Sequence, residues 1–412
     1  MKLYALALSL SALSAWALAS CGGRTGLLVG DSAPGVLPPF PGDAAAATPP
    51  PPCVAWKVIA GPTAISSASE PLEVTTLLAG PSGPVVSWTD ILDPASDLAY
   101  HARALGWDGT PVAADQALMT RSGSGEWSAP GLIVTASGFD AITWAAGDGC
   151  RFETLDGTAA PSSQPIVLGQ SDCYMPLASP PGLSLLTSPD LMRQTTVSFE
   201  TVDGNGAVGQ TREIISTDAY VMSRVDLGDS TTGVLWASGM NPSALVYQRF
   251  SAAGMPLGVP ATVAAAAYGS AMARAGGGLL VVYEDSSTFA IEVVPLDASG
   301  AAQSAPAVLD LGSSPTGSPD GFSITSIPAE DALLTWYFGN AGPGQVYAMS
   351  LSPAGVPRGP PSEIAQLPVV ELESNTLAVV APDGQHAVVA TSAWLDPNGS
   401  EQAVTVGLEC VQ

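Results

Sequence analysis

Three carboxylates closely follow short apolar runs that end in an aromatic residue. Asp90 lies two residues after Trp88, and Glu284 and Asp285 follow Tyr283. Two carboxylates in one pocket can cleave a glycosidic bond, and carboxylates beside aromatic rings can bind a ligand. The candidate ligand surface comprises Trp88, Asp90, Trp144, Trp236, Tyr283, Glu284, Asp285 and Trp336. The competing interpretation is that the aromatic rings pack inside the protein.

Other catalytic and metal-binding patterns are missing from the sequence. His101 and His386 are the two histidines, and the chain has no His-x-His, HExxH, Cys-x-x-Cys or Gly-x-Ser-x-Gly motif. We therefore expect both histidines to be solvated, with no catalytic residue, no transition metal and no cofactor. Residues 203–206 and 396–399 offer oxygen ligands but lack the alternating acids of a calcium loop, so we interpret them as turns. The sequence leaves a structural calcium ion as an alternative.

The composition favours many short segments joined by turns. Of the 412 residues, 46% are hydrophobic and 12% are charged, with 44 glycines and 37 prolines. The formal net charge of -25 repels phosphate backbones, which argues against a nucleic-acid partner. The charge serves solubility outside the cell or favours a cation or a basic partner.

The N-terminus carries an export signal. Lys2 precedes an apolar run at residues 3–18, which ends in Leu-Ala-Ser-Cys at residues 18–21. This ending resembles the lipobox of bacterial lipoproteins, which implies cleavage before Cys21 and a lipid on its thiol. An ordinary signal peptide with a chance cysteine is the alternative. Gly22 stands where an acidic residue would mark inner-membrane retention, which favours the outer membrane.

The sequence divides into three parts. We expect a signal peptide at residues 1–20, and a lipidated linker rich in Pro and Ala at residues 21–52. We expect a repetitive all-β body at residues 53–412.

The body repeats a unit of short β-rich runs and turns. First runs occur at residues 85–88, 141–144, 234–236, 281–283 and 334–336. The last glycines of six turns lie at positions 109, 157, 206, 254, 300 and 355, so that consecutive ones are 48, 49, 48, 46 and 55 residues apart. A period of this size, built from short strands, is typical of β-propeller blades.

Residues 233–258 resemble a repeat that is common in secreted bacterial proteins. That repeat has an apolar strand ending in Trp, a strand ending in Arg-apolar-Asp, and a Gly-x-x-x-Gly turn. Residues 101–109 and 345–359 are looser copies. The resemblance implies a propeller and no particular activity.

The ends of the chain suggest how the ring closes. Seven units can be counted, with six or eight blades as alternatives, and the last unit stops after its third strand at residues 403–408. Residues 54–59 lie where its fourth strand is missing. We therefore predict an all-β, seven-bladed propeller in which the N-terminal strand completes the C-terminal blade and removes its open edge.

Cysteine positions fit this closure. Apart from Cys21 the chain has four cysteines, which allow three pairings. The propeller predicts a Cys53–Cys410 disulfide that locks the ring. It then predicts a Cys150–Cys173 disulfide across the outer strands of one blade. Free buried thiols are the alternative.

These features favour a lipid-anchored binding or interaction module of the bacterial cell envelope. Its membrane is expected to be the outer one, at the periplasmic or the surface face, and its partner a protein or a carbohydrate. We expect a monomer. The alternatives are an envelope enzyme, such as a carboxylate-based glycosidase or lyase, and a structural envelope component.

Overall fold

The computed structural model describes residues 51–66, 71–80, 82–93, 97–122, 127–135, 138–145, 149–169, 171–179, 182–189, 196–215, 219–239, 243–312, 319–328, 330–338, 343–370, 376–395 and 401–412. The predicted signal peptide, Cys21 and most of the predicted linker lie outside these residues, as does the turn at residues 396–399. Within them, no helix has the length and apolar character needed to cross a membrane.

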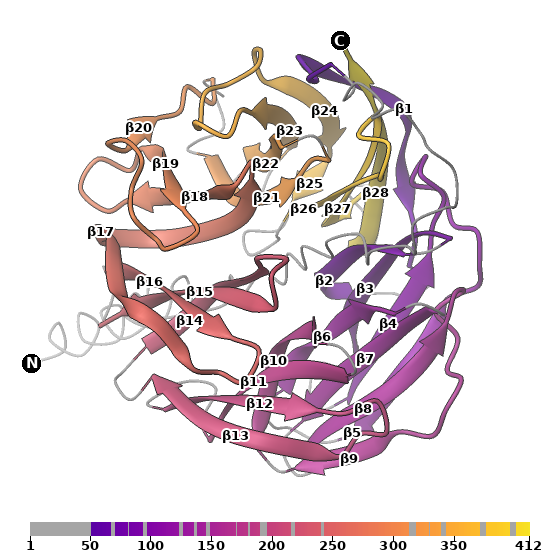
Figure 1. The fold of residues 1–412 in the computed structure, drawn as a ribbon. Helices are drawn as coiled ribbons and strands as arrows, with labels where there is room; N and C mark the ends of the chain where they lie inside the picture. Colours follow the sequence, from indigo (N-terminus) through magenta and orange to yellow (C-terminus); the bar gives the residue numbers. More distant parts are fainter. Residues whose placement is uncertain are drawn as a thin grey trace, which may run out of the picture.

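The described strands form seven antiparallel blades arranged as a ring (Figure 1). Blade 1 contains β2 (Pro71–Gly80), β3 (Gly83–Asp93), β4 (Asp97–Ala104) and β5 (Gln116–Ser122). Blade 2 contains β6 (Trp127–Val134), β7 (Gly138–Ala145), β8 (Gly149–Asp156) and β9 (Ile166–Gly169). Blade 3 contains β10 (Asp172–Ser179), β11 (Gly182–Ser188), β12 (Val197–Val202) and β13 (Val208–Ile215).

Blades 4 and 5 share one strand. Blade 4 contains β14 (Ala219–Asp226), β15 (Thr231–Ser238), β16 (Ser243–Ser251) and the first part of β17 (Pro256–Ala275). Blade 5 contains the second part of β17, β18 (Gly278–Asp285), β19 (Ile291–Asp297) and β20 (Ala307–Val308). At the crossing, Ala267 pairs with Ser243 on one side and with Asp285 on the other.

Blades 6 and 7 complete the ring. Blade 6 contains β21 (Pro319–Ser326), β22 (Ala332–Phe338), β23 (Gly344–Leu351) and β24 (Ser362–Leu367). Blade 7 contains β26 (Leu377–Val380), β27 (His386–Trp394), β28 (Glu401–Val411) and β1 (Ala55–Ala64), and β25 (Val369–Val370) also pairs with β27. The first strands of neighbouring blades contact one another around the centre of the ring.

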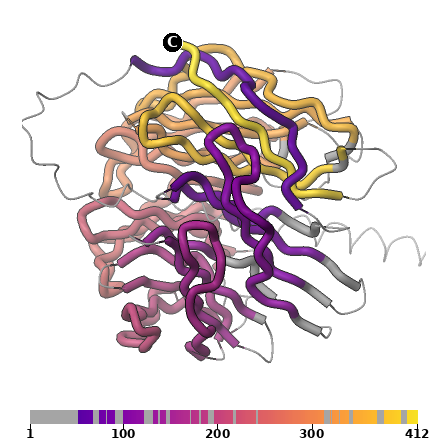
Figure 2. Tube along the Cα trace, turned by 90° about the vertical axis from the view of Figure 1, so that its right-hand side faces the viewer, coloured from indigo at the N-terminus to yellow at the C-terminus, as the bar shows by residue number. Residues whose placement is uncertain are grey.

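The N-terminal strand closes the ring as the sequence predicted. β1 pairs antiparallel with β28, from Ala55 opposite Val411 to Ala64 opposite Val404. Figure 2 shows these two segments of opposite chain ends side by side. The Cys53–Cys410 disulfide lies at the same place and joins residues 357 apart in sequence. Closure is therefore both hydrogen-bonded and covalent.

The second disulfide has the predicted partners but a different place. Cys150 and Cys173 are bonded. Cys150 lies on β8 of blade 2, whereas Cys173 lies on β10, the inner strand of blade 3. The prediction placed both on one blade, but β9 intervenes, so that the chain has already crossed to the next blade. The disulfide therefore links two blades.

The hydrophobic core lies between the blades. The described residues form seven clusters of buried apolar side chains, and each cluster draws on two neighbouring blades. Alternation along each strand gives a blade two apolar faces, so that both must be covered by neighbours. Each blade is thus stable only as a member of the ring.

The repeated turns between third and fourth strands share one geometry. In blade 5, Asp297 Oδ1 accepts hydrogen bonds from the N–H groups of Ser299 (2.8 Å) and Ala301 (3.0 Å), and Gly300 has a φ of 91°. Blade 2 departs from the predicted glycine: the residue with positive φ is Ala159 (64°), and Gly157 lies two positions earlier. The periodic sequence signal therefore marks the turn correctly but misplaces its left-handed residue.

The turn glycines also contact the preceding blade. A Cβ on Gly300 would lie 2.3 Å from the Tyr247 ring of blade 4. A Cβ on Gly254 would lie 2.9 Å from Phe199 of blade 3. The period of the sequence thus reflects two constraints, which are backbone conformation and close approach between blades.

Replacement of Gly300 tests the close approach. We expect Gly300→Ala to lower the free energy of unfolding by about 2–4 kcal/mol, because it adds left-handed strain and a clash with Tyr247. Gly258 is a matched control, with a φ of 92° and no atom within 4 Å of its would-be Cβ. Gly258→Ala should cost only about 1 kcal/mol. Equal losses in denaturant unfolding would show that the contact with Tyr247 contributes nothing.

Removal of each disulfide tests the closure. We expect the double replacement of Cys53 and Cys410 by Ala to lower stability by about 2–5 kcal/mol, because the bond closes nearly the whole body. The Cys150–Cys173 bond closes a much shorter loop, so the double replacement of these two residues by Ala should lower stability less. Thermal unfolding of both variants and of wild type measures the difference. A larger loss for the Cys150–Cys173 pair would contradict the ring-closure account.

Candidate functional site

The five aromatic residues of the candidate ligand surface lie in the core. All are at most 6% exposed, and each belongs to a different cluster between two blades. Trp88 packs between blades 7 and 1, and Trp336 between blades 5 and 6. The interpretation of these rings as a ligand surface is therefore wrong, because they lie within the second strands and pack between blades. The remaining three aromatic residues, which pack between blades in the same way, are Trp144, Trp236 and Tyr283.

Asp285 organises a turn on blade 5. Its Oδ1 accepts hydrogen bonds from the backbone N–H and hydroxyl of Ser287 (3.0 and 2.6 Å) and of Thr288 (2.9 and 2.9 Å). These bonds lower the pKa of Asp285 to about 2. Glu284 precedes it and pairs with Ile291 across the hairpin.

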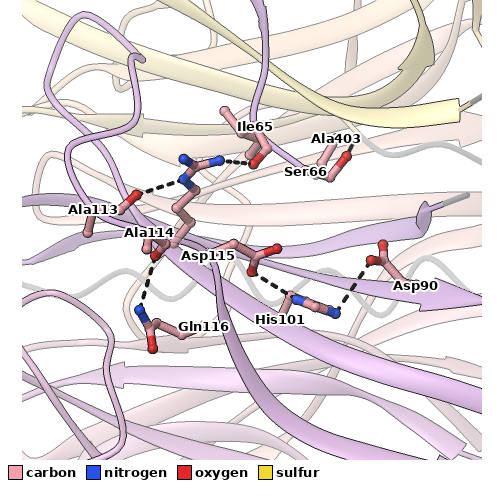
Figure 3. Close-up of polar contacts among 10 residues, drawn as sticks. Ile65, Ser66, Asp90, His101, Ala113, Ala114, Asp115, Gln116 and Ala403 are labelled. Carbon is pink, nitrogen blue, oxygen red and sulfur yellow. Dashed lines mark hydrogen bonds and ion pairs between the residues drawn. The ribbon is translucent and has the colours of Figure 1, made fainter. Parts of the chain in front are cut away.

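Asp90 is the one candidate acid that is fully buried. It lies on β3, and its Oδ2 is 3.4 Å from Nε2 of His101 on β4. The other ring nitrogen of His101, Nδ1, lies 2.8 Å from Oδ1 of Asp115 (Figure 3). Trp88 stacks on the His101 ring with centroids 5.4 Å apart. We refer to Asp90, His101 and Asp115 as the blade 1 triad.

Burial and charge compete within the blade 1 triad. Burial raises the pKa of Asp90, and the charge of His101 opposes this rise. Burial disfavours the imidazolium, but the hydrogen bond and charge of Asp115, together with the charge of Asp90, outweigh it and raise the pKa of His101. The triad therefore favours a charged histidine held between two acids.

The triad lies beside the ring closure. Arg103, two residues after His101 on β4, donates from Nε to the carbonyl of Ala113 (2.9 Å) and from Nη1 to the carbonyl of Ile65. Ile65 follows β1, and its N–H donates to the carbonyl of Ala403 on β28 (2.8 Å). Arg103 thus connects blade 1 to the closing segment, while the blade 1 triad joins β3, β4 and the segment before β5 within blade 1.

Sequence reasoning missed the role of His101. We expected a solvated residue, but its side chain is only 13% exposed. The usable signal was the hairpin register, which places His101 directly opposite Trp88. His386 is separate: it lies on β27 of blade 7, and its Nδ1 is 3.1 Å from Asp383. The two histidines share no site.

The predicted turn at residues 203–206 is present. Asp203 Oδ1 accepts hydrogen bonds from the N–H groups of Asn205 (2.8 Å) and Ala207 (2.9 Å). In the part of the chain that the structure describes, no group of three His, Cys, Asp or Glu side chains is arranged to hold a metal ion. The carboxylates Asp90 and Asp285 lie on blades 1 and 5 and are not brought together.

The fold and its closure define a seven-bladed β-propeller. Comparison with solved structures finds proteins of similar fold. A protein of unknown function from Dyadobacter fermentans DSM 18053 is 12% identical, with a TM-score of 0.50 over 87% of this chain and 99% of that one. Hydrazine synthase from Kuenenia stuttgartiensis is 14% identical, with a TM-score of 0.43 over 64% of this chain and 75% of that one. A mutant of AofleA from Arthrobotrys oligospora is 12% identical, with a TM-score of 0.41 over 70% and 94%.

These likenesses concern the fold alone, because the identities are low. No protein-family model matches the chain, and no curated protein matches it.

The triad predicts a pH dependence of stability. Because its folded-state pKa lies above the ordinary 6.5, His101 stabilises the fold below that pH. The stabilisation is lost as pH rises through the folded-state pKa. Asp90, whose pKa is also raised, acts in the same direction.

The test compares melting temperatures of wild type and His101→Gln between about pH 5 and pH 9. Glutamine keeps a donor and an acceptor but cannot take up the proton. We expect the advantage of wild type to be largest at acidic pH and to shrink as pH rises. His386→Gln, at a more exposed histidine, is the control, and its melting temperature should differ little from that of wild type across this pH range. A difference that grows with pH would refute a charged His101.

Proposed function

We propose that this protein is a lipid-anchored binding module of the bacterial cell envelope. In this proposal a lipid on Cys21 holds the chain at a membrane, residues 22–52 act as a stalk, and the propeller presents its surface to a partner. The lipid-bearing residue and most of the stalk lie outside the described residues, so that they are proposed from the sequence.

The observation that carries the proposal is the position of the ring closure, which lies directly after the proposed stalk. The stalk leads into Cys53 and then into β1, the strand that completes blade 7. A pull on the stalk would peel β1 from β28 if hydrogen bonds alone held it. The Cys53–Cys410 disulfide carries that load instead, as suits a tethered body. Two disulfides are also typical of proteins outside the reducing cytoplasm.

The described residues favour binding over the enzyme alternative. A glycosidase needs two carboxylates about 5–10 Å apart in one pocket. Asp90 and Asp115 do lie close together in blade 1, but both face the His101 ring between them and Asp90 is fully buried, and Asp285 caps a turn on blade 5. Each is engaged in the structure of its own blade.

Charge favours a basic partner. Removing residues 1–20, whose one charged side chain is Lys2, changes the net charge from -25 to -25 - 1 = -26. Three arginines are also paired or buried: Arg358 pairs with Asp331, Arg249 pairs with Asp229, and Arg224 is buried. The surface field therefore attracts cations and repels anionic headgroups and nucleic acid.

Replacement of Cys21 tests the anchor. Cells fed an alkyne fatty acid should label the wild-type protein, and its mature N-terminus should be residue 21. Cys21→Ala should yield an unlabelled, unprocessed precursor, because the acceptor thiol is gone. Ser20→Ala keeps a small residue before the cleavage site and should be labelled like wild type. Labelling that persists in Cys21→Ala would show that the lipid is elsewhere.

Binding is tested in intact cells with a carbodiimide, which joins carboxylates to amines at contact distance. A binding module should give one conjugate with a second polypeptide, whose yield saturates as expression rises. If only the unconjugated protein is found, the proposal is contradicted, and the alternative of a structural envelope component is left.

A further inference from the structure

Two aromatic side chains lie exposed on blade 5. Phe289, in the turn between β18 and β19, is 58% exposed, and Tyr268, on β17, is 37% exposed. Their rings stack, with centroids 5.8 Å apart and planes inclined by 16°. One face of the Phe289 ring thus covers Tyr268 and the other is free of it. We refer to the pair as the blade 5 platform.

The turn holds Phe289 in a costly conformation. Its φ is 55°, in the left-handed region that bulky side chains rarely adopt. The backbone is fixed by hydrogen bonds from Phe289 N to the carbonyl of Asp285 (2.8 Å) and from Asp285 N to the carbonyl of Ala290 (2.9 Å). A large apolar ring kept exposed at such a position points to a role at the surface.

The platform lies at the end of the ring where second strands finish. Tyr268 is near the start of the inner strand of blade 5, and the Phe289 turn follows β18 directly. Beside Tyr268, a Cβ on Gly269 would lie 3.8 Å from the ring of Phe322 on β21. The platform therefore borders the inner strand of blade 6 as well.

An ionised carboxylate belongs to the same turn. Asp285 stays charged because four hydrogen bonds converge on its Oδ1 and lower its pKa to about 2. All four go to Oδ1, so that Oδ2 can accept from a ligand. An open aromatic face next to fixed negative charge attracts a cation rather than a neutral group.

We propose that the blade 5 platform binds an arginine or lysine side chain of a basic peptide segment on a protein partner. The cation lies over the free face of Phe289, and Asp285 Oδ2 accepts its hydrogen bond. The inference rests on the proposed binding function and names the partner chemistry. The net charge of -25 complements such a segment.

The test titrates the full-length protein in detergent with a short oligo-arginine peptide, at physiological salt. We expect saturable binding that Phe289→Ala and Tyr268→Ala each weaken roughly fivefold to thirtyfold. Phe289→Trp should keep or strengthen it, since Trp is the best ring for this contact. Val259→Ala, at an 83% exposed apolar residue of the same strand, is the matched control and should bind like wild type. Melting curves check that each variant is folded.

Three outcomes would overturn the inference. Affinity for the peptide that is equal in both platform variants and in Val259→Ala would show that bulk charge alone binds it. Loss of peptide affinity in Phe289→Trp would show that the aromatic ring at this position does not contact the cation. Binding of a neutral chito-oligosaccharide, lost in Phe289→Ala while peptide binding persists, would assign the platform to sugar.

Failure here is distinguishable from failure of the proposed function. If the platform variants still form the carbodiimide conjugate in cells, the protein binds its partner elsewhere and the proposed function stands. If wild type forms no conjugate, the proposed function fails whatever the peptide result.

Discussion

The pairing of β1 with β28 is the constraint on which the molecule depends. A blade has two apolar faces, and each cluster of buried side chains belongs to two blades. An open ring would expose one face of blade 1 and one face of blade 7, together with the unpaired edge of β28. Closure by the N-terminal strand removes all three at once, and Cys53–Cys410 makes it covalent.

The same closure explains the polar features of blade 1. Arg103 donates to the carbonyl of Ile65, just after β1, and Gly109 lies against Val406 and Gly407 of β28. Corresponding turn glycines elsewhere approach large side chains of the preceding blade, such as Tyr247. At the closure two backbones meet directly, because Gly407 has no side chain. The contact between blades 7 and 1 therefore follows the pattern of the others with smaller residues.

The sequence could predict the features that depend on strand count and period. It indicated seven blades, the closing strand and the partners of both disulfides, since each follows from where a unit begins or ends. It could not place Cys150 and Cys173 on neighbouring blades, because the length of the fourth strand is not encoded in the period. It also could not separate an aromatic residue that binds a ligand from one that packs between blades, because both roles favour Trp in a second strand. Likewise, the pairing of His101 with Asp90 and Asp115 depends on cross-strand register, which one residue of shift would destroy.

The uninterrupted strand β17 has a mechanical consequence. Ala267 pairs with Ser243 of blade 4 and with Asp285 of blade 5, and Tyr268 follows it immediately. Blades 4 and 5 therefore cannot rotate against each other without breaking the ladder on one side. A force applied at Tyr268 is therefore divided between the strands of two blades, because β17 pairs with β16 on one side and with β18 on the other.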